Sequence, residues 1–282
     1  MSVRLIIDSA SDISNAEAQK LGICMIPMLI NIADEEFLDG VELSPKQFYE
    51  KLVESDALPK TSQINEYRFS EVFERELKSY DELIVISISS KLSGTYASAV
   101  RAAEKFNGKV FVVDSLSATV GERLLAQHAL HLLKEGKSAK ETVDVLNVVK
   151  KNLRIMAMVG TLEYLKKGGR ISSAVAFAGE LLSIKPVIAV VEGEVKLVGK
   201  AMGSKKANNL LNKLVQESGG IDFSMPFGAI YSGLNDALLQ KYIADSAALW
   251  KNHADNVPIY PVGGTIGTHV GPGAIGVAFF KN

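Results

Sequence analysis

Short apolar, β-branched runs alternate with amphipathic segments along the first half of the chain. Residues 3–8, 83–88 and 110–114 are apolar at almost every position, as expected of strands covered on both faces of a parallel sheet. Between these runs apolar residues recur at helical spacing, and Ser44 followed by Pro45 marks a helix start. The first half therefore predicts alternating strands and helices around a mainly parallel sheet.

The second half departs from this alternation. Residues 153–160 predict a strand, and residues 186–201 predict two strands joined by a Glu-Gly turn into an antiparallel hairpin. A helix, a strand, a second helix and two further strands follow. We therefore predict an α/β fold with two α/β domains: residues 1–152 with a mainly parallel sheet, and residues 153–282 with a mixed sheet that includes the hairpin.

Two other apolar segments need an interpretation. Residues 23–30 are predicted as one strand. Residues 256–280 contain no Asp, Glu, Lys or Arg and are long enough to cross a membrane. Their six glycines and three prolines argue against a spanning helix, which must satisfy its own backbone hydrogen bonds in lipid. This segment is predicted as a strand, a glycine-rich loop and a final strand, so no integral membrane segment is expected.

Composition narrows the class of protein. The 282 residues are 47% hydrophobic and 22% charged, which predicts a folded globular protein rather than a disordered chain. A net charge of −1 gives no electrostatic signature of nucleic-acid or anionic-membrane binding. The single Cys24 stands in an apolar run and is expected to be buried and reduced. No export signal is visible, and a cytoplasmic protein is expected.

Patterns that resemble cofactor or metal motifs fail on their context. Residues 271–276 match G-x-G-x-x-G, but a dinucleotide site needs a following helix and only six residues remain. No P-loop, nucleophile elbow or H-E-x-x-H motif occurs in the sequence. His128 and His131 share a predicted helix face, but no neighbouring ligands complete a metal shell. We predict neither a metal site nor a cofactor.

The strongest functional signal follows the strand predicted at residues 83–88. Residues 89–99, SSKLSGTYASA, bring hydroxyls and a glycine to the start of a predicted helix. Unpaired N–H groups at a helix N-terminus bind anions, so this loop predicts a site for an anionic head group. Residues 8–12 follow another strand and either share the same rim of the sheet or cap the next helix.

Three other polar segments are candidates to complete this site. Thr61 and Ser62 lie in a short polar stretch between predicted helices, where they either cap the second helix or bind the ligand. Arg170 follows two glycines after a short predicted helix, where it either fixes the helix C-terminus or faces an anion. His269 stands among glycines that either let the backbone approach a ligand closely or serve tight turns in which His269 caps a carbonyl.

In combination, these segments resemble the DegV family of bacterial fatty-acid-binding proteins across essentially the whole chain. The resemblance rests on the order and spacing of seven pieces: DSASD at 8–12, KTSQ at 60–63, LSGTY at 92–96, VDS at 113–115, LKKGGRIS at 165–172, KP at 185–186 and GTHVGPG at 267–273.

This resemblance implies a two-domain α/β protein that holds one long-chain fatty acid between its domains. It implies a binding subunit rather than an enzyme, which presents the carboxylate to a separate ATP-dependent fatty-acid kinase subunit. The acyl phosphate would then pass to phospholipid synthesis. Arg170 would face the kinase or the head group. The residues implied in carboxylate binding are Thr61, Ser62, Ser93, Gly94, Thr95 and His269.

The residues themselves leave a second function open, a serine-dependent acyl hydrolase. Ser93 would be its nucleophile and His269 its base, within hydrogen-bond reach of the hydroxyl. The small and bulky apolar side chains of residues 171–184 suit either the wall of an acyl-chain tunnel or a core helix.

Overall fold

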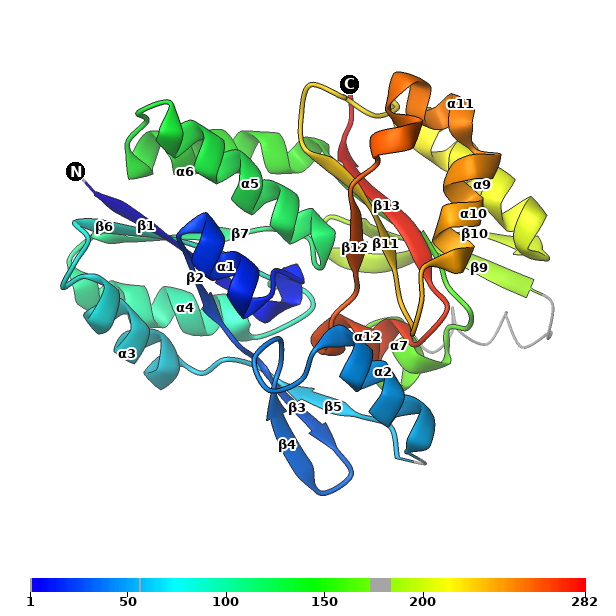
Figure 1. Ribbon diagram of the computed structural model, residues 1–282. Helices are drawn as coiled ribbons and strands as arrows, with labels where there is room; N and C mark the ends of the chain where they lie inside the picture. The colour runs from blue at the N-terminus through cyan, green and yellow to red at the C-terminus, as the bar shows by residue number, and fades with distance from the viewer. Residues whose placement is uncertain (1, 56, 173–183) are drawn as a thin grey trace.

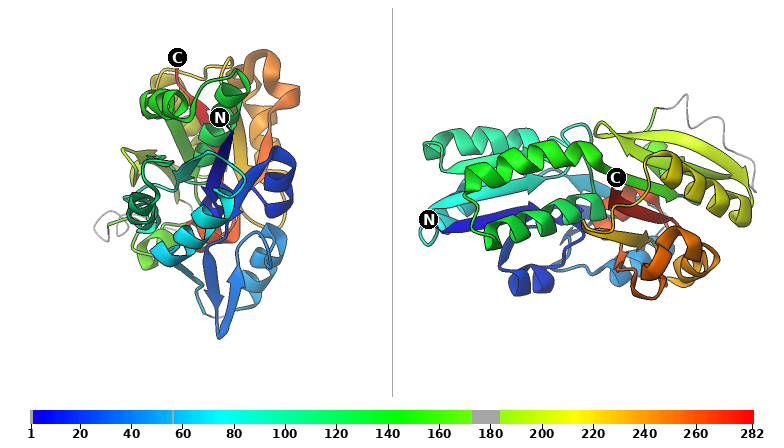
Figure 2. Two further views of the ribbon diagram at one scale, coloured as in Figure 1. Left: turned by 90° about the vertical axis from the view of Figure 1, so that its left-hand side faces the viewer. Right: turned by 90° about the horizontal axis from the view of Figure 1, so that it is seen from above.

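The computed structural model describes residues 2–55, 57–172 and 184–282. In Figure 1 a four-stranded sheet lies on the left, a six-stranded sheet on the right and a small three-stranded sheet below them. Seen from above in Figure 2, the two larger sheets follow one another along the length of the molecule.

The four-stranded sheet is parallel throughout, in the order β2-β1-β6-β7. Its strands are β1 (Val3–Asp8), β2 (Ile23–Ile26), β6 (Glu82–Ser87) and β7 (Val110–Asp114). In Figure 1, α5 (Val120–Lys134) and α6 (Ala139–Val149) lie above it, α3 (Glu66–Glu76) and α4 (Thr95–Ala103) lie below, and α1 (Asn15–Leu21) lies in front. Helices on both faces explain the continuously apolar strands, and this confirms the predicted sheet.

The six-stranded sheet is mixed, in the order β10-β9-β8-β13-β11-β12, and only β11 and β12 run parallel. Its strands are β8 (Leu153–Met158), β9 (Ile184–Val191), β10 (Glu194–Met202), β11 (Phe227–Tyr231), β12 (Ile259–Pro261) and β13 (Ile275–Phe280). The predicted hairpin joins β9 to β10, and its turn residues Glu192 and Gly193 both have positive φ, 51° and 85°. The helices on this side are α9 (Ser204–Glu217), α10 (Ala237–Asp245) and α11 (Ala247–Trp250).

Four short 3₁₀ helices occur among the described residues of these two regions. They are η1 (Ser9–Ser11), η2 (Glu104–Phe106), η3 (Lys150–Asn152) and η5 (Lys251–Asn256).

The third sheet corrects the prediction of one strand at residues 23–30. The segment divides at Pro27: β2 joins the parallel sheet, whereas β3 (Leu29–Ile32) pairs antiparallel with β4 (Glu35–Leu38) and β5 (Lys60–Ser62). Proline cannot donate to a strand ladder, and the next N–H, of Met28, donates to Ser9 Oγ at 3.0 Å instead. Helix α2 (Pro45–Glu54) follows β4 and opens with the predicted Ser44 cap.

A second correction concerns the predicted glycine-rich loop within residues 256–280. Residues 264–270 form the helix α12 (Gly264–Val270). Local propensity disfavours a helix with two glycines, but tertiary contacts override it here. A Cβ at Gly264 would lie 2.4 Å from Ile30 Cδ1, and one at Gly267 would lie 2.6 Å from Phe48 Cε1. The glycines therefore allow α12 to pack closely against β3 and α2.

The hydrophobic core continues across the predicted division at residue 152. One cluster joins Leu5 and Ile84 of the parallel sheet to Ile155 and Ala278 of the mixed sheet, and α5 contacts strands of both sheets. The strands of the two larger sheets lie on either side of residue 152, and the division into two domains stays a prediction.

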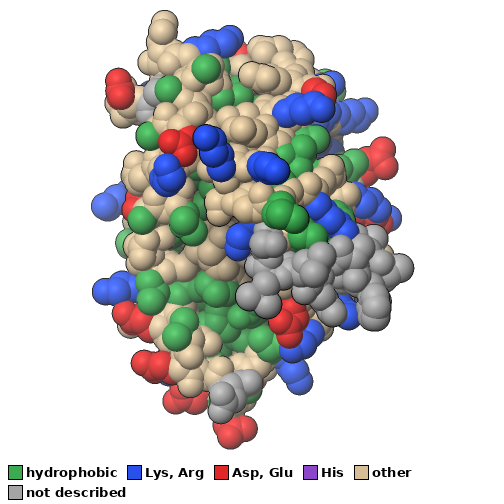
Figure 3. All heavy atoms as spheres, turned by 90° about the vertical axis from the view of Figure 1, so that its right-hand side faces the viewer, with side chains coloured by type: hydrophobic (Ala, Val, Ile, Leu, Met, Phe, Trp, Pro, Cys, Tyr) green, Lys and Arg blue, Asp and Glu red, His purple; other side chains and the backbone are tan. Residues whose placement is uncertain are grey.

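Within the described residues, no helix has the length and apolar character needed to cross a bilayer. Basic and acidic side chains both occur on the face shown in Figure 3, where apolar side chains also reach the surface.

Candidate functional site

A largely apolar cavity of about 230 Å³ lies where the three sheets meet. The parallel half contributes Ile88 and Leu92, and the mixed sheet contributes Ile155, Ile188 and Ile230. The polar side chains and the glycine of the predicted site that line the same cavity are Thr61, Ser62, Ser93, Gly94, Arg170 and His269.

The buried carboxylate of Asp8 fixes the start of the loop after β6. Asp8 Oδ2 accepts hydrogen bonds from Ile88 N at 2.9 Å and Ser87 Oγ at 3.1 Å. The loop then turns back on itself, and the N–H groups of Leu92 and Ser93 donate to the Ser89 carbonyl at 3.0 and 3.1 Å. This fixed turn delivers Ser93 to the cavity directly before α4, as predicted.

Gly94 is the N-cap residue of α4 and has no side-chain cap. The N-terminus of this nine-residue helix therefore adjoins the cavity that Gly94 lines, and its partial positive charge favours an anion there. A Cβ at Gly94 would lie 2.0 Å from Gln63 Oε1, so the Gln63 amide packs directly on the helix start. Sequence reasoning missed Gln63 as a lining residue, although it quoted the KTSQ segment.

Thr95 differs from the other predicted site residues because it is fully buried and does not line the cavity. Its N–H donates to Ser93 Oγ at 3.2 Å, and its Oγ1 lies 2.9 Å from the same oxygen. Ile64 N donates to Thr95 Oγ1 at 3.2 Å. Thr95 thus contacts Ser93 from behind, on the side away from the cavity.

Thr61 and His269 meet across the polar part of the cavity. Thr61 lies on β5, not in the predicted loop, and its Oγ1 is 3.0 Å from His269 Nε2 on α12. The following helix, α3, is capped by Asn65, so neither Thr61 nor Ser62 is its N-cap. The exposed Ser62 also lines the cavity.

His269 is held neutral by its surroundings. Burial, followed by the positive charge of Arg170, lowers the pKa of His269 to about 4. Its Nδ1 is buried with no hydrogen-bond partner among the described residues. The ring packs on Gly168, where a Cβ would lie 2.2 Å from Nδ1. The missing side chain of Gly168 therefore lets the His269 ring lie against the backbone. Gly169 serves another purpose, because its φ of 70° is a conformation that favours glycine.

Arg170 follows α7 (Glu163–Lys167) as predicted and reaches back to the cavity. Its guanidinium donates to the Gly168 carbonyl at 2.6 Å and to the Leu92 carbonyl at 3.2 Å. No carboxylate forms an ion pair with it among the residues that the structure describes. Partial burial lowers its pKa, and an anion in the cavity would compensate its charge.

The residues 8–12 do not line the cavity and serve the fold instead. Asp12 Oδ1 accepts from Gly263 N at 2.9 Å, and Asp39 accepts from Gly264 N and Thr265 N at 3.1 and 3.2 Å. These acids fix the start of α12 and thereby position His269. Helix α1 is capped by Ser14, whose side chain accepts from Glu17 N, and not by residues 8–12.

Burial raises the pKa of four acids that lie behind the cavity, Asp8, Asp12, Asp39 and Glu122, which we call the acidic interior. The pKa of Asp8 rises to about 6 and that of Asp12 to about 7. The Asp39 pKa is also raised. The pKa of Glu122 is raised well above its usual range by burial and by the charges of Asp8 and Asp12. Neither oxygen of Glu122 has a hydrogen-bond partner in the described part of the chain.

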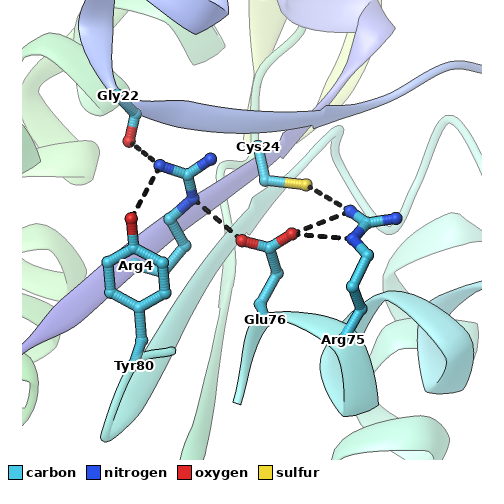
Figure 4. Close-up of polar contacts among 6 residues, drawn as sticks. All are labelled: Arg4, Gly22, Cys24, Arg75, Glu76 and Tyr80. Carbon is cyan, nitrogen blue, oxygen red and sulfur yellow. Dashed lines mark hydrogen bonds and ion pairs between the residues drawn. The ribbon is translucent and has the colours of Figure 1, made fainter. Parts of the chain in front are cut away.

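Cys24 and the histidines of α5 do not form sites. Figure 4 shows Glu76 between Arg4 and Arg75, at 3.0 and 2.8 Å, with Cys24 Sγ 3.3 Å from Arg75. Burial raises the pKa of the Cys24 thiol to about 11, which keeps it protonated and unreactive. Within the described ranges, no cluster of His, Cys, Asp and Glu could hold a metal ion.

The apolar walls contain residues that the sequence did not single out. Apart from Ile88 and Leu92, they include Ala118, Ile155, Ile188, Val190, Val195, Ile230, Val262 and Ile266. The segment 171–184, considered as a tunnel wall, lies mostly outside the described residues. Ile171 is buried beside Leu165 and Ile188, which line the cavity.

These features define a class: an α/β protein with an apolar cavity whose polar part offers hydrogen-bond donors. The chain belongs to the DegV family, because the model of a family described as "Uncharacterised protein, DegV family" matches residues 2–282. A DegV domain-containing protein of Deinococcus radiodurans is 33% identical over 282 residues, which cover 99% of this chain and 98% of the relative.

Solved structures of the same family share the fold. A fatty-acid-binding DegV family protein from Thermus thermophilus has a TM-score of 0.87 and 32% identity, with all of both chains covered. DegV from Bacillus subtilis, described as a fatty acid binding protein, has a TM-score of 0.83 and 30% identity over the full length of both chains. A DegV family protein from Eubacterium eligens, loaded with heptadecanoic acid, has a TM-score of 0.83 and 26% identity with the same full coverage.

Proposed function

We propose that this protein binds one long-chain fatty acid and presents its carboxylate to a separate ATP-dependent kinase subunit. The observation that carries the proposal is the cavity itself: its walls are apolar, and its polar part offers the Ser93 and Thr61 hydroxyls, the α4 N-terminus and Arg170, with no carboxylate among the described lining residues to pair with them. Donors that surround an apolar cavity suit a ligand with an anionic head and a hydrocarbon tail.

The energetics divide between the two ends of such a ligand. Burying 12 to 16 methylenes at about 0.8 kcal/mol each gives roughly 10–13 kcal/mol before ordering costs. Each charge-assisted hydrogen bond adds about 1.5–3 kcal/mol. The tail therefore supplies most of the affinity, while Ser93 and Thr61 fix the orientation. His269, bonded to Thr61, holds that hydroxyl in place.

The kinase step is the finer part of the proposal. A carboxylate at Ser93 would lie next to Arg170, whose charge would stabilise a developing acyl phosphate. The kinase would supply ATP and Mg²⁺, and the acyl phosphate would serve phospholipid synthesis in the cytoplasm. Support comes from the family resemblance of the motifs and from the absence of a P-loop in the sequence.

The geometry does not favour the acyl-hydrolase alternative. Ser93 Oγ is hydrogen-bonded to Thr95, and His269 Nε2 is bonded to Thr61 rather than to Ser93. Ser93 therefore lacks the adjacent base that a serine nucleophile needs.

Fatty-acid binding is tested on protein purified under native conditions. Solvent extraction and mass spectrometry should recover a long-chain fatty acid, and titration with added fatty acid should saturate at one ligand per chain. Ser93→Ala should weaken binding about tenfold, the equivalent of one lost charge-assisted bond. The proposal fails if the protein yields no lipid and binds no added fatty acid.

The kinase step is tested with Arg170→Ala. Because the tail supplies most of the affinity, this variant should bind fatty acid only a few-fold more weakly than the wild type. It should be phosphorylated at least tenfold more slowly by a fatty-acid kinase, because the guanidinium acts mainly on the developing phosphate. Lys167→Ala is a matched control, since Lys167 is exposed and pairs with Glu163 on the surface at 2.6 Å. Loss of fatty-acid binding in Arg170→Ala would instead make Arg170 a ligand or structural residue.

A further inference from the structure

The hydroxyl of Thr95 decides which way the Ser93 hydroxyl can point. Thr95 is fully buried, and among the described residues its Oγ1 has two neighbours within hydrogen-bond distance, Ile64 N at 3.2 Å and Ser93 Oγ at 2.9 Å. A threonine hydroxyl has one proton and two lone pairs. Ile64 N can only donate, so the single proton of Thr95 Oγ1 has one available acceptor, the oxygen of Ser93.

Donation in the other direction, from Ser93 to Thr95, would leave the Thr95 hydroxyl proton without an acceptor. If Ser93 donated to Thr95, the Thr95 proton would have no acceptor in a fully buried position, and unmet buried donors are disfavoured. With Thr95 as donor, Ser93 Oγ accepts from both Thr95 Oγ1 and Thr95 N, the latter at 3.2 Å. Both lone pairs of Ser93 are then occupied, and its own proton remains for the cavity.

We propose that Thr95 is a positioning residue that makes Ser93 an obligate hydrogen-bond donor toward the cavity. The inference rests on the proposed function and specifies its selectivity: the site accepts a head group that offers a bare acceptor oxygen, a carboxylate, and disfavours head groups that must also donate. A fatty alcohol, whose hydroxyl carries a proton, is the matched test ligand. With its lone pairs occupied, Ser93 is also a poor nucleophile.

The test compares tetradecanoic acid with tetradecanol in the same protein, because the ratio of the two dissociation constants cancels a general loss of stability. Thr95→Val keeps the shape but removes the donor, so Ser93 Oγ gains a free lone pair and can accept from an alcohol. In Thr95→Val the preference for the acid should fall about tenfold. In Thr95→Ser, which keeps the hydroxyl, the preference should equal that of the wild type. Thr142→Val is the control, because this buried threonine lies on α6 and its hydroxyl has no hydrogen-bond partner in the part of the chain that the structure describes.

Two outcomes overturn the inference: an unchanged acid-to-alcohol ratio in Thr95→Val, or a ratio that Thr95→Ser fails to restore. Ile64 N loses its acceptor in Thr95→Val; if that variant does not fold, Thr95→Cys, with a weakly donating thiol, replaces it and should show a smaller fall. An unchanged ratio in that variant overturns the inference equally. A wild type that binds no fatty acid contradicts the proposed function itself, and the first titration shows this.

Discussion

The cavity and the acidic interior beside it both contain hydroxyls and a helix N-terminus, but they differ in the supply of carboxylate acceptors. Around the cavity, Ser93, Thr61 and Arg170 supply donors, and no carboxylate meets them among the described residues. In the interior, Asp12 and Asp39 supply carboxylates whose oxygens accept from the backbone at the start of α12 and from the hydroxyls of Thr265 and Thr119.

This difference separates a binding region from a structural one. Hydroxyls and helix N-termini occur in both places, so residue type alone does not identify the site. Where carboxylates already satisfy the donors, the region holds the fold together. Where donors outnumber acceptors beside an apolar cavity, the region can take an anion from outside. Glu122 is the exception in the interior, because neither of its oxygens lies within hydrogen-bonding geometry of a donor among the described residues.

The largest expected effect comes from removing an acceptor in the interior. Asp39→Ala would leave the buried N–H groups of Gly264 and Thr265 unpaired and would leave the Thr265 hydroxyl only the Ser9 hydroxyl, 3.5 Å away, among the described residues. We expect the free energy of unfolding to fall by about 3–5 kcal/mol, as measured by urea denaturation. Fatty-acid binding should be lost as well, since α12 carries His269.

Asp39→Asn is the matched control for that variant. It keeps the shape and one acceptor oxygen but not the charge that favours a helix N-terminus, so its loss of stability should be smaller. Equal midpoints for Asp39→Ala and the wild type would show that the interior does not position α12.

The next effect belongs to the cavity and comes from Gly168→Ala. The new methyl group would collide with His269 Nδ1, displacing the ring from Thr61. Fatty-acid affinity should fall about tenfold, or about 1.4 kcal/mol, by titration. The displaced ring should also meet water, so NMR should show the His269 pKa rising from about 4 toward its usual value.

Gly169→Ala tests whether this effect arises from the collision. Gly169 has a φ of 70° but nothing within 4 Å of an added Cβ, so the change should cost roughly 1–2 kcal/mol of stability without altering fatty-acid affinity. A similar loss of affinity in both variants would refute a specific role for Gly168.

The smallest effect is a gain in stability from Glu122→Gln. The raised pKa values of Glu122, Asp8 and Asp12 mean that the folded protein keeps these protons to higher pH than the unfolded chain does. Wild-type stability should therefore fall as pH rises from about 4, the unfolded carboxyl range, through about 7. Glu122→Gln removes the contribution of Glu122 to this loss of stability. The variant should therefore be about 1–2 kcal/mol more stable than the wild type at pH 8, with little difference at pH 4.

A calorimetric series across this pH range measures the difference. A variant that is less stable than the wild type at pH 8 would show that Glu122 has a favourable partner in the folded protein.

Local signals explain what the sequence could predict. The Ser93 loop was predictable because a buried strand, a hydroxyl-rich turn and a helix start are adjacent in the chain. The hairpin of the mixed sheet was predictable from its Glu-Gly turn. The helical form of α12 was not, because Asp39 and Phe48, far away in the sequence, determine it.

Other parts of the site depend wholly on tertiary contacts. Nothing local shows that Gly168 supports His269 or that Gln63 packs on Gly94. The apolar wall residues were also unpredictable, because Ile155 or Ile188 in a buried strand looks the same whether it faces a ligand or another side chain.

One hydrogen bond connects the parallel half of the molecule to the hairpin of the mixed sheet. Ser89 Oγ donates to the Gly193 carbonyl at 2.8 Å, which attaches the head-group loop to the turn of the β9–β10 hairpin. A Cβ at Gly193 would lie 2.5 Å from the Ser89 Oγ atom. Exchanging this hairpin between family members to alter acyl-chain preference would therefore transplant a part of the head-group support too, and chimeras should keep Ser89 and Gly193 as a pair.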